Sequence, residues 1–183
     1  MTEVNPEPLD GILEMDGTYI GGKKIGQGAH AAKKAKVPVF VIKRRGGELR
    51  FFKAEDVKSG TLARYIKENV GTDVAVIMTD EAYVYPMAIF RAGIGKPHKS
   101  VNHSEGIYAN GDITTNGIES AFSLLKRGTV GSWHKVSAKH LPAYLDEMKF
   151  RFNDNRHNPY LFRDTMLKLI EATVLEYGKL TAA

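Results

Sequence analysis

The sequence contains no cysteine and no long apolar run. The absence of cysteine excludes disulfides, thiolate zinc ligands and thiol nucleophiles, so any catalytic metal must be held by oxygen or histidine. No apolar segment approaches the roughly 18 residues of a membrane span, and the N-terminus lacks the pattern of a signal peptide. These absences predict a cytoplasmic protein without membrane contact.

Acidic residues are scarce in one long part of the chain. Between Lys23 and Lys53 there are ten lysines or arginines but only one acid, Glu48, whereas the first 16 residues are acidic. Segment 21–36 is rich in glycine, alanine and lysine, and it predicts a mobile basic loop. Such a loop could close over a phosphate backbone or be only a solvated hairpin tip. The net charge of +5 favours a polyanionic partner weakly.

Length and composition indicate a single globular domain. The chain has 183 residues, of which 43% are apolar and 26% charged, enough for a substantial core. We expect an acidic flexible leader over residues 1–10, the domain itself over 11–178 and a short tail over 179–183.

The first half of the chain has clear strand patterns. Three segments have the alternating or β-branched composition of antiparallel strands: 11–20, 37–45 and 48–54. A helix capped by Ser59 or Thr61 is predicted to run to about residue 69. The continuous apolar run 74–78 then predicts a strand buried on both faces.

The second half is predicted to be mainly helical. After a helix over 82–92 interrupted at Pro86, we expect a polar edge strand over 96–103 and a loop over 104–115. A turn over 130–136 precedes two helices, over 137–153 and 159–177. The residues expected to face inward from these two helices are Leu141, Tyr144, Leu145, Met148, Leu161, Met166, Leu169, Ile170 and Val174.

A helix over 115–127 has the most informative pattern. Ile118, Phe122 and Leu125 recur at helical spacing, and Ala121 and Leu124 are expected to widen this apolar stripe. Glu119 lies at the stripe's edge and is predicted to be half-buried, and Lys126 follows it by two turns on the same side. The carboxylate of Glu119 could bind a cation and the ammonium group of Lys126 a phosphate. An ordinary amphipathic helix, however, has the same pattern.

Two aspartates occupy strands that should be neighbours. Three strands, a helix and a parallel central strand follow the order of the ribonuclease H-like fold, an α/β fold in which the first and central strands are adjacent. Asp16 and Asp80 would then lie side by side, where their charges repel unless a divalent cation neutralises them. With Glu119 they would form an oxygen-ligand set for Mg²⁺ or Mn²⁺. Each aspartate alone could equally be a strand-end cap.

Five segments resemble bacterial DDE transposases of the ISXO-two type. They are M-D-G-T-Y-I-G-G-K, M-T-D-E-A-Y, V-N-H-S-E-G-I-Y, T-N-G-I-E-S-A-F-S-L-L-K-R-G-T-V-G and S-A-K-H-L-P-A-Y-L-D-E-M-K-F-R-F-N, in that order between about residues 13 and 162. The resemblance implies a five-stranded mixed sheet flanked by helices, two Mg²⁺ or Mn²⁺ ions, and cutting and joining of DNA at transposon ends. By motif, the acids are Asp16, Asp80 and Glu119, with Asn116 in reserve, and Lys126 is the basic residue.

The resemblance also implies partners. DNA, as transposon ends and as target, would be bound by a homo-oligomer associated with the bacterial nucleoid. The residues expected to contact DNA are Lys23, Lys24, Lys33, Lys34, His103, Lys126, Arg127, His134 and Arg151. Family members usually carry a zinc-ribbon or helix-turn-helix region first, and about a dozen residues before the first strand are too few for one. A separate N-terminal DNA-binding region or protein is therefore expected.

Several positions depart from the family's usual residues. Glycine stands at 17 and 117 where glutamate and threonine are usual, and Gly117 is expected to weaken the helix before Glu119.

Two alternatives to a transposase remain: a catalytically idle DNA-binding or oligomerisation module, and a structure-specific nuclease of the same fold. The scattered histidines show no i, i+4 pair, which disfavours a zinc site.

Overall fold

The computed structural model describes residues 6–21, 36–101, 109–110, 113–114, 116–133, 136–154 and 158–171. Its strands are β1 (Leu9–Ile20), β2 (Val37–Arg44), β3 (Leu49–Lys53), β4 (Val70–Asp80), β5 (His98–Val101) and the short pair β6 (Ala109–Asn110) and β7 (Ile113–Thr114). Its helices are α2 (Ser59–Asn69), α3 (Val84–Arg91), α4 (Asn116–Arg127), the π-helical turn η1 (Gly128–Ser132), α5 (Leu141–Asp154) and α6 (Leu161–Glu171).

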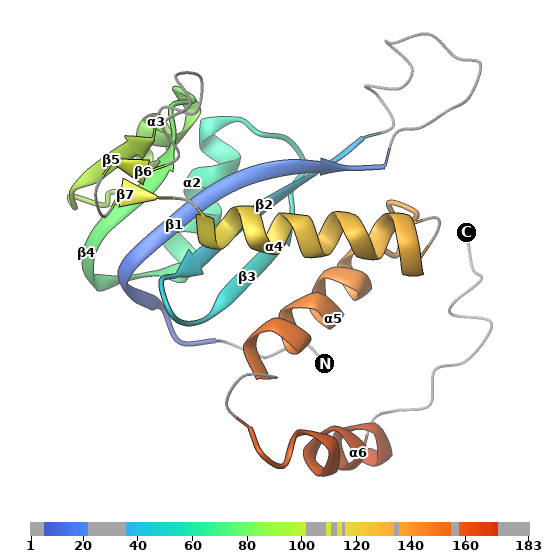
Figure 1. Ribbon diagram of the computed structural model, residues 1–183. Helices are drawn as coiled ribbons and strands as arrows, with labels where there is room; N and C mark the ends of the chain where they lie inside the picture. Colours follow the sequence, from blue (N-terminus) through green and yellow to red (C-terminus); the bar gives the residue numbers. More distant parts are fainter. Residues whose placement is uncertain are drawn as a thin grey trace, which may run out of the picture.

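The main sheet has five strands in the order β3-β2-β1-β4-β5, as Figure 1 shows. β1 pairs antiparallel with β2 and parallel with β4, and β4 pairs parallel with β5. The predicted mixed α/β sheet of the ribonuclease H-like type is therefore confirmed, with β1 adjacent to β4 as expected. β1 begins at residue 9, two residues earlier than predicted.

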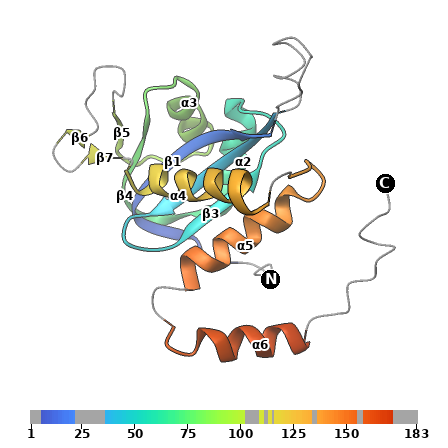
Figure 2. The same ribbon diagram turned by 45° about the vertical axis from the view of Figure 1, so that its right-hand side comes forward.

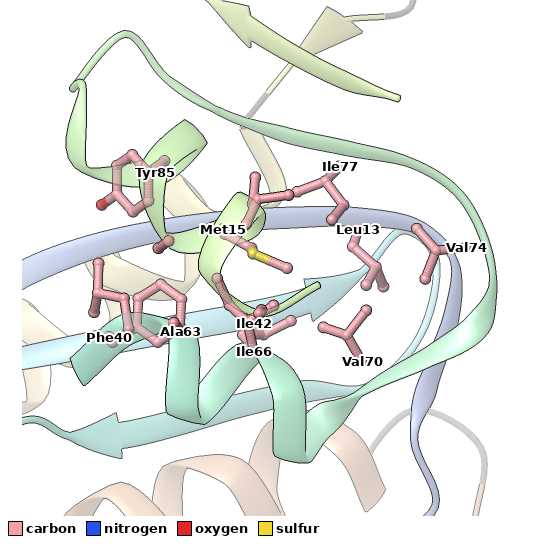
Figure 3. Close-up of a cluster of buried hydrophobic side chains, with 14 of the residues drawn as sticks. Leu13, Met15, Phe40, Ile42, Ala63, Ile66, Val70, Val74, Ile77 and Tyr85 are labelled. Carbon is pink, nitrogen blue, oxygen red and sulfur yellow. The ribbon is translucent and has the colours of Figure 1, made fainter. Parts of the chain in front are cut away.

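Alternation along the strands divides the core into two clusters. Leu13, Met15 and Phe40 face α2 and α3, and Figure 3 shows them packed with Ala63 and Ile66 of α2. The neighbouring strand residues face α4 and α5, whose buried side chains form the second cluster. In Figure 2, α4 and α5 lie on the opposite side of the sheet from α2 and α3. Side chains that point to opposite faces of a strand thus meet different helices.

Two predictions about the first helices were wrong. Pro86 does not interrupt α3, because it is the third residue of the helix, where a missing N–H costs no hydrogen bond. α2 begins after Lys58 without a side-chain cap, and the hydroxyl of Thr61 donates instead to Oδ1 of Asp56 at 2.6 Å. By contrast, the backbone N–H of His140 donates to Oγ of Ser137 at 3.3 Å, near the predicted start of α5.

The inward face predicted for the last helix was also wrong within its described residues. No residue of α6 is buried: Met166 is 41% exposed and Ile170 75% exposed. Both views show α6 outside the two helix layers (Figure 1, Figure 2), although Nζ of Lys168 lies 5.2 Å from the ring centroid of Phe150 on α5. Periodicity identifies the side chains that share a face, but it does not supply a surface to cover them. Val174 lies outside the described residues. None of the described helices has the length and apolar character needed to cross a membrane.

Candidate active site at the β1–β4 edge

The structure places Asp16 and Asp80 at the same level on neighbouring strands. The parallel register of β1 and β4 pairs Leu13 with Ile77 and Glu14 with Met78, and each aspartate lies two residues beyond that last pair. Both side chains are half-buried. Residues two apart on a strand point to the same face of a sheet. Glu14 contacts Ile118 of α4, so Asp16 and Asp80, each two residues beyond the Glu14–Met78 pair, project from the face on which α4 packs.

The hydroxyl of Tyr85 connects α3 with this pair of acids. It donates a hydrogen bond of 3.2 Å to Oδ1 of Asp16, which also accepts the backbone N–H of Gly17 at 2.6 Å. Burial, followed by the negative charges of Asp16 and Asp80, raises the pKa of Tyr85 far above its usual range. The phenol therefore remains protonated and acts as a donor.

Asp80 is fixed by the turn that follows β4. Its Oδ1 accepts the backbone N–H of Ala82 at 3.0 Å, which is the local side-chain-to-backbone bond typical of an aspartate at a strand end. Next to it, Oγ1 of Thr79 and Nε2 of His98 on β5 are 2.9 Å apart. Burial lowers the pKa of His98.

Helix α4 packs through a narrower stripe than predicted. Ile118, Ala121, Phe122 and Leu125 are buried, but Leu124 is 41% exposed. Glu119 and Lys126 are exposed as well, so the predicted half-burial of Glu119 is wrong. At 100° per residue, positions 119 and 124 each lie about 110° from the centre of the stripe, on opposite sides. Glu119 and Lys126 are about 20° apart by the same geometry, so they share one side of the helix.

Glu14 is a buried acid next to this helix that was not predicted from the sequence as a site residue. Its side chain is 2% exposed. Oε1 accepts a hydrogen bond from Nε of Arg45 at 3.2 Å, and Oε2 accepts one from the backbone N–H of Ile118 at 3.2 Å. Nη2 of Arg45 also contacts Sδ of Met78 at 3.1 Å. The available signal was a glutamate two residues before Asp16 in an otherwise apolar stretch of strand. Its partners, however, come from distant parts of the chain.

Gly117 allows this close contact between β1 and α4. A Cβ atom at position 117 would lie 2.6 Å from Oε2 of Glu14 and 2.6 Å from Nζ of Lys43. Lys43 pairs with Glu14 in the β1–β2 register and is only 6% exposed. Any larger residue at 117 would therefore displace buried charged groups. Helix propensity alone did not predict this need for a small residue.

The three predicted acids do not form a preassembled metal site. Within the described ranges, no three histidine or acidic side chains come together as a group that could hold a metal ion. Asp16 and Asp80 lie near each other, and Glu119 projects from the first turn of α4 without completing a group with them. The donor chemistry fits a hard divalent cation, because all three ligands would be carboxylate oxygens. Asn116 is the exposed first residue of the same helix.

Only part of the predicted DNA-contacting set can be placed. Lys23, Lys24, Lys33, Lys34, His103 and His134 lie outside the described residues. Lys126 and Arg127 are exposed in the last turn of α4. Arg151 is exposed on α5, where it forms an ion pair of 2.6 Å with Glu147.

Comparison with known proteins finds a matching family. The family model described as the ISXO2-like transposase domain matches residues 8–153, which include β1, β4, α4 and all but the last residue of α5. No curated protein and no solved structure matches the chain significantly. Since the family match covers well over half of the residues, the chain belongs to the ISXO2-like transposase domain family.

Proposed function

We propose that this chain is the catalytic domain of a DNA transposase, which cleaves phosphodiesters at transposon ends and transfers the strands in a metal-dependent reaction. The observation that carries the proposal is the parallel register of β1 and β4, which puts Asp16 and Asp80 at one level of neighbouring strands, with the hydroxyl of Tyr85 donating to Asp16. Membership of a transposase family supports DNA as the substrate.

Asp16, Asp80 and Glu119 would hold two Mg²⁺ or Mn²⁺ ions, with Asn116 as the alternative third ligand. When bound, two such ions supply Lewis-acid activation of water or of a DNA 3′-hydroxyl and stabilise the leaving oxygen of an in-line attack. The chain's own residues would bind the ions and the DNA and would orient the metal ligands. Tyr85 would hold one oxygen of Asp16 by a hydrogen bond, and Lys126 would contact the DNA backbone on the side of α4 that carries Glu119. No covalent protein nucleophile is required.

The proposal extends to the assembly. A transposase that joins ends would act as a homo-oligomer on DNA, at the nucleoid in the cytoplasm of a bacterium. Sequence preference would come mainly from a separate N-terminal region or protein. Binding by this domain alone should therefore be sensitive to salt and nearly independent of sequence, because phosphate contacts dominate it.

A labelled duplex that carries the element's terminal repeat tests the activity. We expect nicking and strand joining in Mn²⁺ and neither in EDTA, with activity lost in Asp16→Ala, Asp80→Ala and Glu119→Ala. Asp73→Ala is the matched control, because Asp73 is an exposed aspartate near the opposite end of β4. All four variants should keep the circular dichroism spectrum of the wild type.

The outcomes separate the alternatives. Nicking without joining would favour a structure-specific nuclease. DNA binding without either reaction would favour a catalytically idle module. Full activity in Asp16→Ala or Asp80→Ala would refute the proposed site.

A further inference from the structure

Glu14 joins the two elements that carry the proposed metal ligands. It lies two residues before Asp16 on β1, and its carboxylate accepts the backbone N–H of Ile118, the residue before Glu119. One hydrogen bond of 3.2 Å thus connects positions that are 104 residues apart in sequence. Between Asp16 and Glu119, this path consists of two strand residues, one hydrogen bond and one helix residue.

We propose that Glu14 is a positioning residue, which fixes the first turn of α4 against β1 and so holds Glu119 at a set distance from Asp16 before any metal binds. The role assigned to Glu119 rests on the proposed function. The attachment of α4 to β1 does not, and it can be measured in the metal-free protein.

The chemistry of the contact suits this role. The first N–H groups of a helix lack partners within the helix, and a carboxylate both accepts their hydrogen bonds and is attracted by the helix dipole. A fully buried carboxylate is tolerated only when it is paired and hydrogen-bonded, and Arg45 and the Ile118 amide meet this requirement for Glu14. Displacing α4 would leave the Glu14 carboxylate without one of these partners. The helix position is therefore linked to the burial of a charge.

Gly117 makes the attachment specific. Its missing side chain leaves room for Oε2 of Glu14 and Nζ of Lys43, each 2.6 Å from the place that a Cβ would occupy. Atoms at that distance overlap, so Gly117→Ala must push the first turn of α4 away from β1 or displace the two buried charges. The substitution disturbs the contact between Glu14 and the first turn of α4 without altering any proposed ligand.

Hydrogen exchange and Mn²⁺ titration test the proposal on Gly117→Ala, Glu14→Gln and Glu14→Leu. In the metal-free protein, amides in the first turn of α4 should exchange several-fold faster in Gly117→Ala and Glu14→Leu, and amides of α2 should not change. Mn²⁺ affinity should fall about ten- to a hundredfold, the range seen when residues that orient metal ligands are removed. Glu14→Gln keeps an acceptor for the Ile118 N–H, so it should give the smallest change. If Glu14→Leu does not fold, Gly117→Ala decides the question.

Gly60→Ala is the matched control. Gly60 is the second residue of α2, as Gly117 is of α4, and a Cβ there would meet only Nη1 of Arg91 at an ordinary 3.6 Å. This variant should keep wild-type exchange in α4 and wild-type Mn²⁺ affinity.

Three results would count against the proposal or its basis. Unchanged exchange in the first turn of α4 in both Gly117→Ala and Glu14→Leu would show that Glu14 does not hold the helix. Faster exchange with unchanged Mn²⁺ affinity would reduce Glu14 to a structural group and overturn its positioning role. A wild-type protein that binds no Mn²⁺ would refute the proposed function, while exchange in the metal-free protein would still decide whether Glu14 holds α4.

Discussion

The hydroxyl of Tyr85 lies 3.2 Å from Oδ1 of Asp16 and 3.3 Å from the place that a Cβ of residue 17 would occupy. Gly17 and Tyr85 therefore fit together: the glycine leaves the space from which the tyrosine reaches the acid. The ring of Tyr85 stacks on Phe40, with centroids 6.5 Å apart, which fixes the direction of the hydroxyl. An interaction between α3 and β1 thus restricts one oxygen of a proposed metal ligand.

Tyr85→Phe should weaken metal binding more than it weakens the fold. The substitution keeps the ring and its stacking but removes the donor to Asp16, so we expect about a tenfold loss of Mn²⁺ affinity. The free energy of unfolding should fall by about 1 kcal/mol, the usual net value of one hydrogen bond. Calorimetric titration and urea denaturation measure the two effects.

Tyr65→Phe is the control for Tyr85→Phe. Its hydroxyl donates to the backbone carbonyl of Lys53 at 3.1 Å, and its ring also packs near Phe40, so the variant removes one tyrosine hydroxyl from the same aromatic cluster. Equal Mn²⁺ affinity in the two variants would show that the Tyr85 hydroxyl does not orient Asp16.

Glu119→Gln and Asn116→Ala decide which residue of α4 is the third ligand. If Glu119 binds the metal, Glu119→Gln should lower Mn²⁺ affinity by more than the roughly tenfold loss typical of an outer-shell partner, and Asn116→Ala should have little effect. The measurement is a Mn²⁺ titration of both variants at one pH. The reverse ranking would transfer the role to Asn116, and wild-type affinity in both would remove α4 from the metal site.

Lys126→Ala should weaken DNA binding without changing metal binding. Lys126 is exposed in the last turn of α4 and shares a side of the helix with Glu119. Removing one phosphate contact should reduce the salt dependence of DNA affinity by about one unit of slope and lower the rate of strand joining, while Mn²⁺ affinity stays at the wild-type value. A salt series with a non-specific duplex measures the slope.

Lys67→Ala is the matched control for Lys126→Ala. Lys67 is an exposed lysine in the last turn of α2, on the opposite face of the sheet. If both variants had the wild-type slope and joining rate, Lys126 would be an ordinary solvated residue.

The stability of the fold should decrease in mild acid partly because of His98. Burial lowers its pKa in the folded protein below the ordinary value of 6.5, so the unfolded chain binds a proton at a higher pH than the folded chain does. The free energy of unfolding should therefore fall as the pH drops through 6.5 toward the folded pKa. His98→Gln removes this contribution. Denaturation measured between about pH 7 and pH 5 should show a smaller decrease in the free energy of unfolding for His98→Gln than for the wild type or for the control His140→Gln.

Local patterns in the sequence predicted most of the sheet and the packing face of α4. Alternation in segments 11–20 and 37–45, and the spacing of Ile118, Phe122 and Leu125, depend only on neighbours in the chain. Glu14 could not be predicted in this way, because its burial depends on Arg45, 31 residues away, and on Ile118, 104 residues away. Exposure of α6 was missed for the same reason: an apolar face is local, and the surface that covers it is not.

Position 117 shows the limit of propensity arguments most clearly. A glycine near a helix start weakens the isolated helix, and on that basis the site was expected to be looser. In the structure, charged atoms of Glu14 and Lys43 lie where a side chain at 117 would be, so contacts with β1 and β2 also bear on this position. The grouping of Asp16 with Asp80 was accessible from sequence only because strand order could be inferred from the succession of elements.

The parallel pairing of β1 with β4 also has a consequence for the order of folding. β1 is the central strand, yet one of its edges is covered only by a strand that follows β2, β3 and α2 in the chain. During synthesis β1 can form a hairpin sheet with β2 and β3 early, but its other edge stays open until β4 leaves the ribosome, and open edges are prone to pairing with other chains. Pulse-labelled exchange during refolding should show the amides of β1 on that edge becoming protected together with β4, and later than the β2–β3 hairpin.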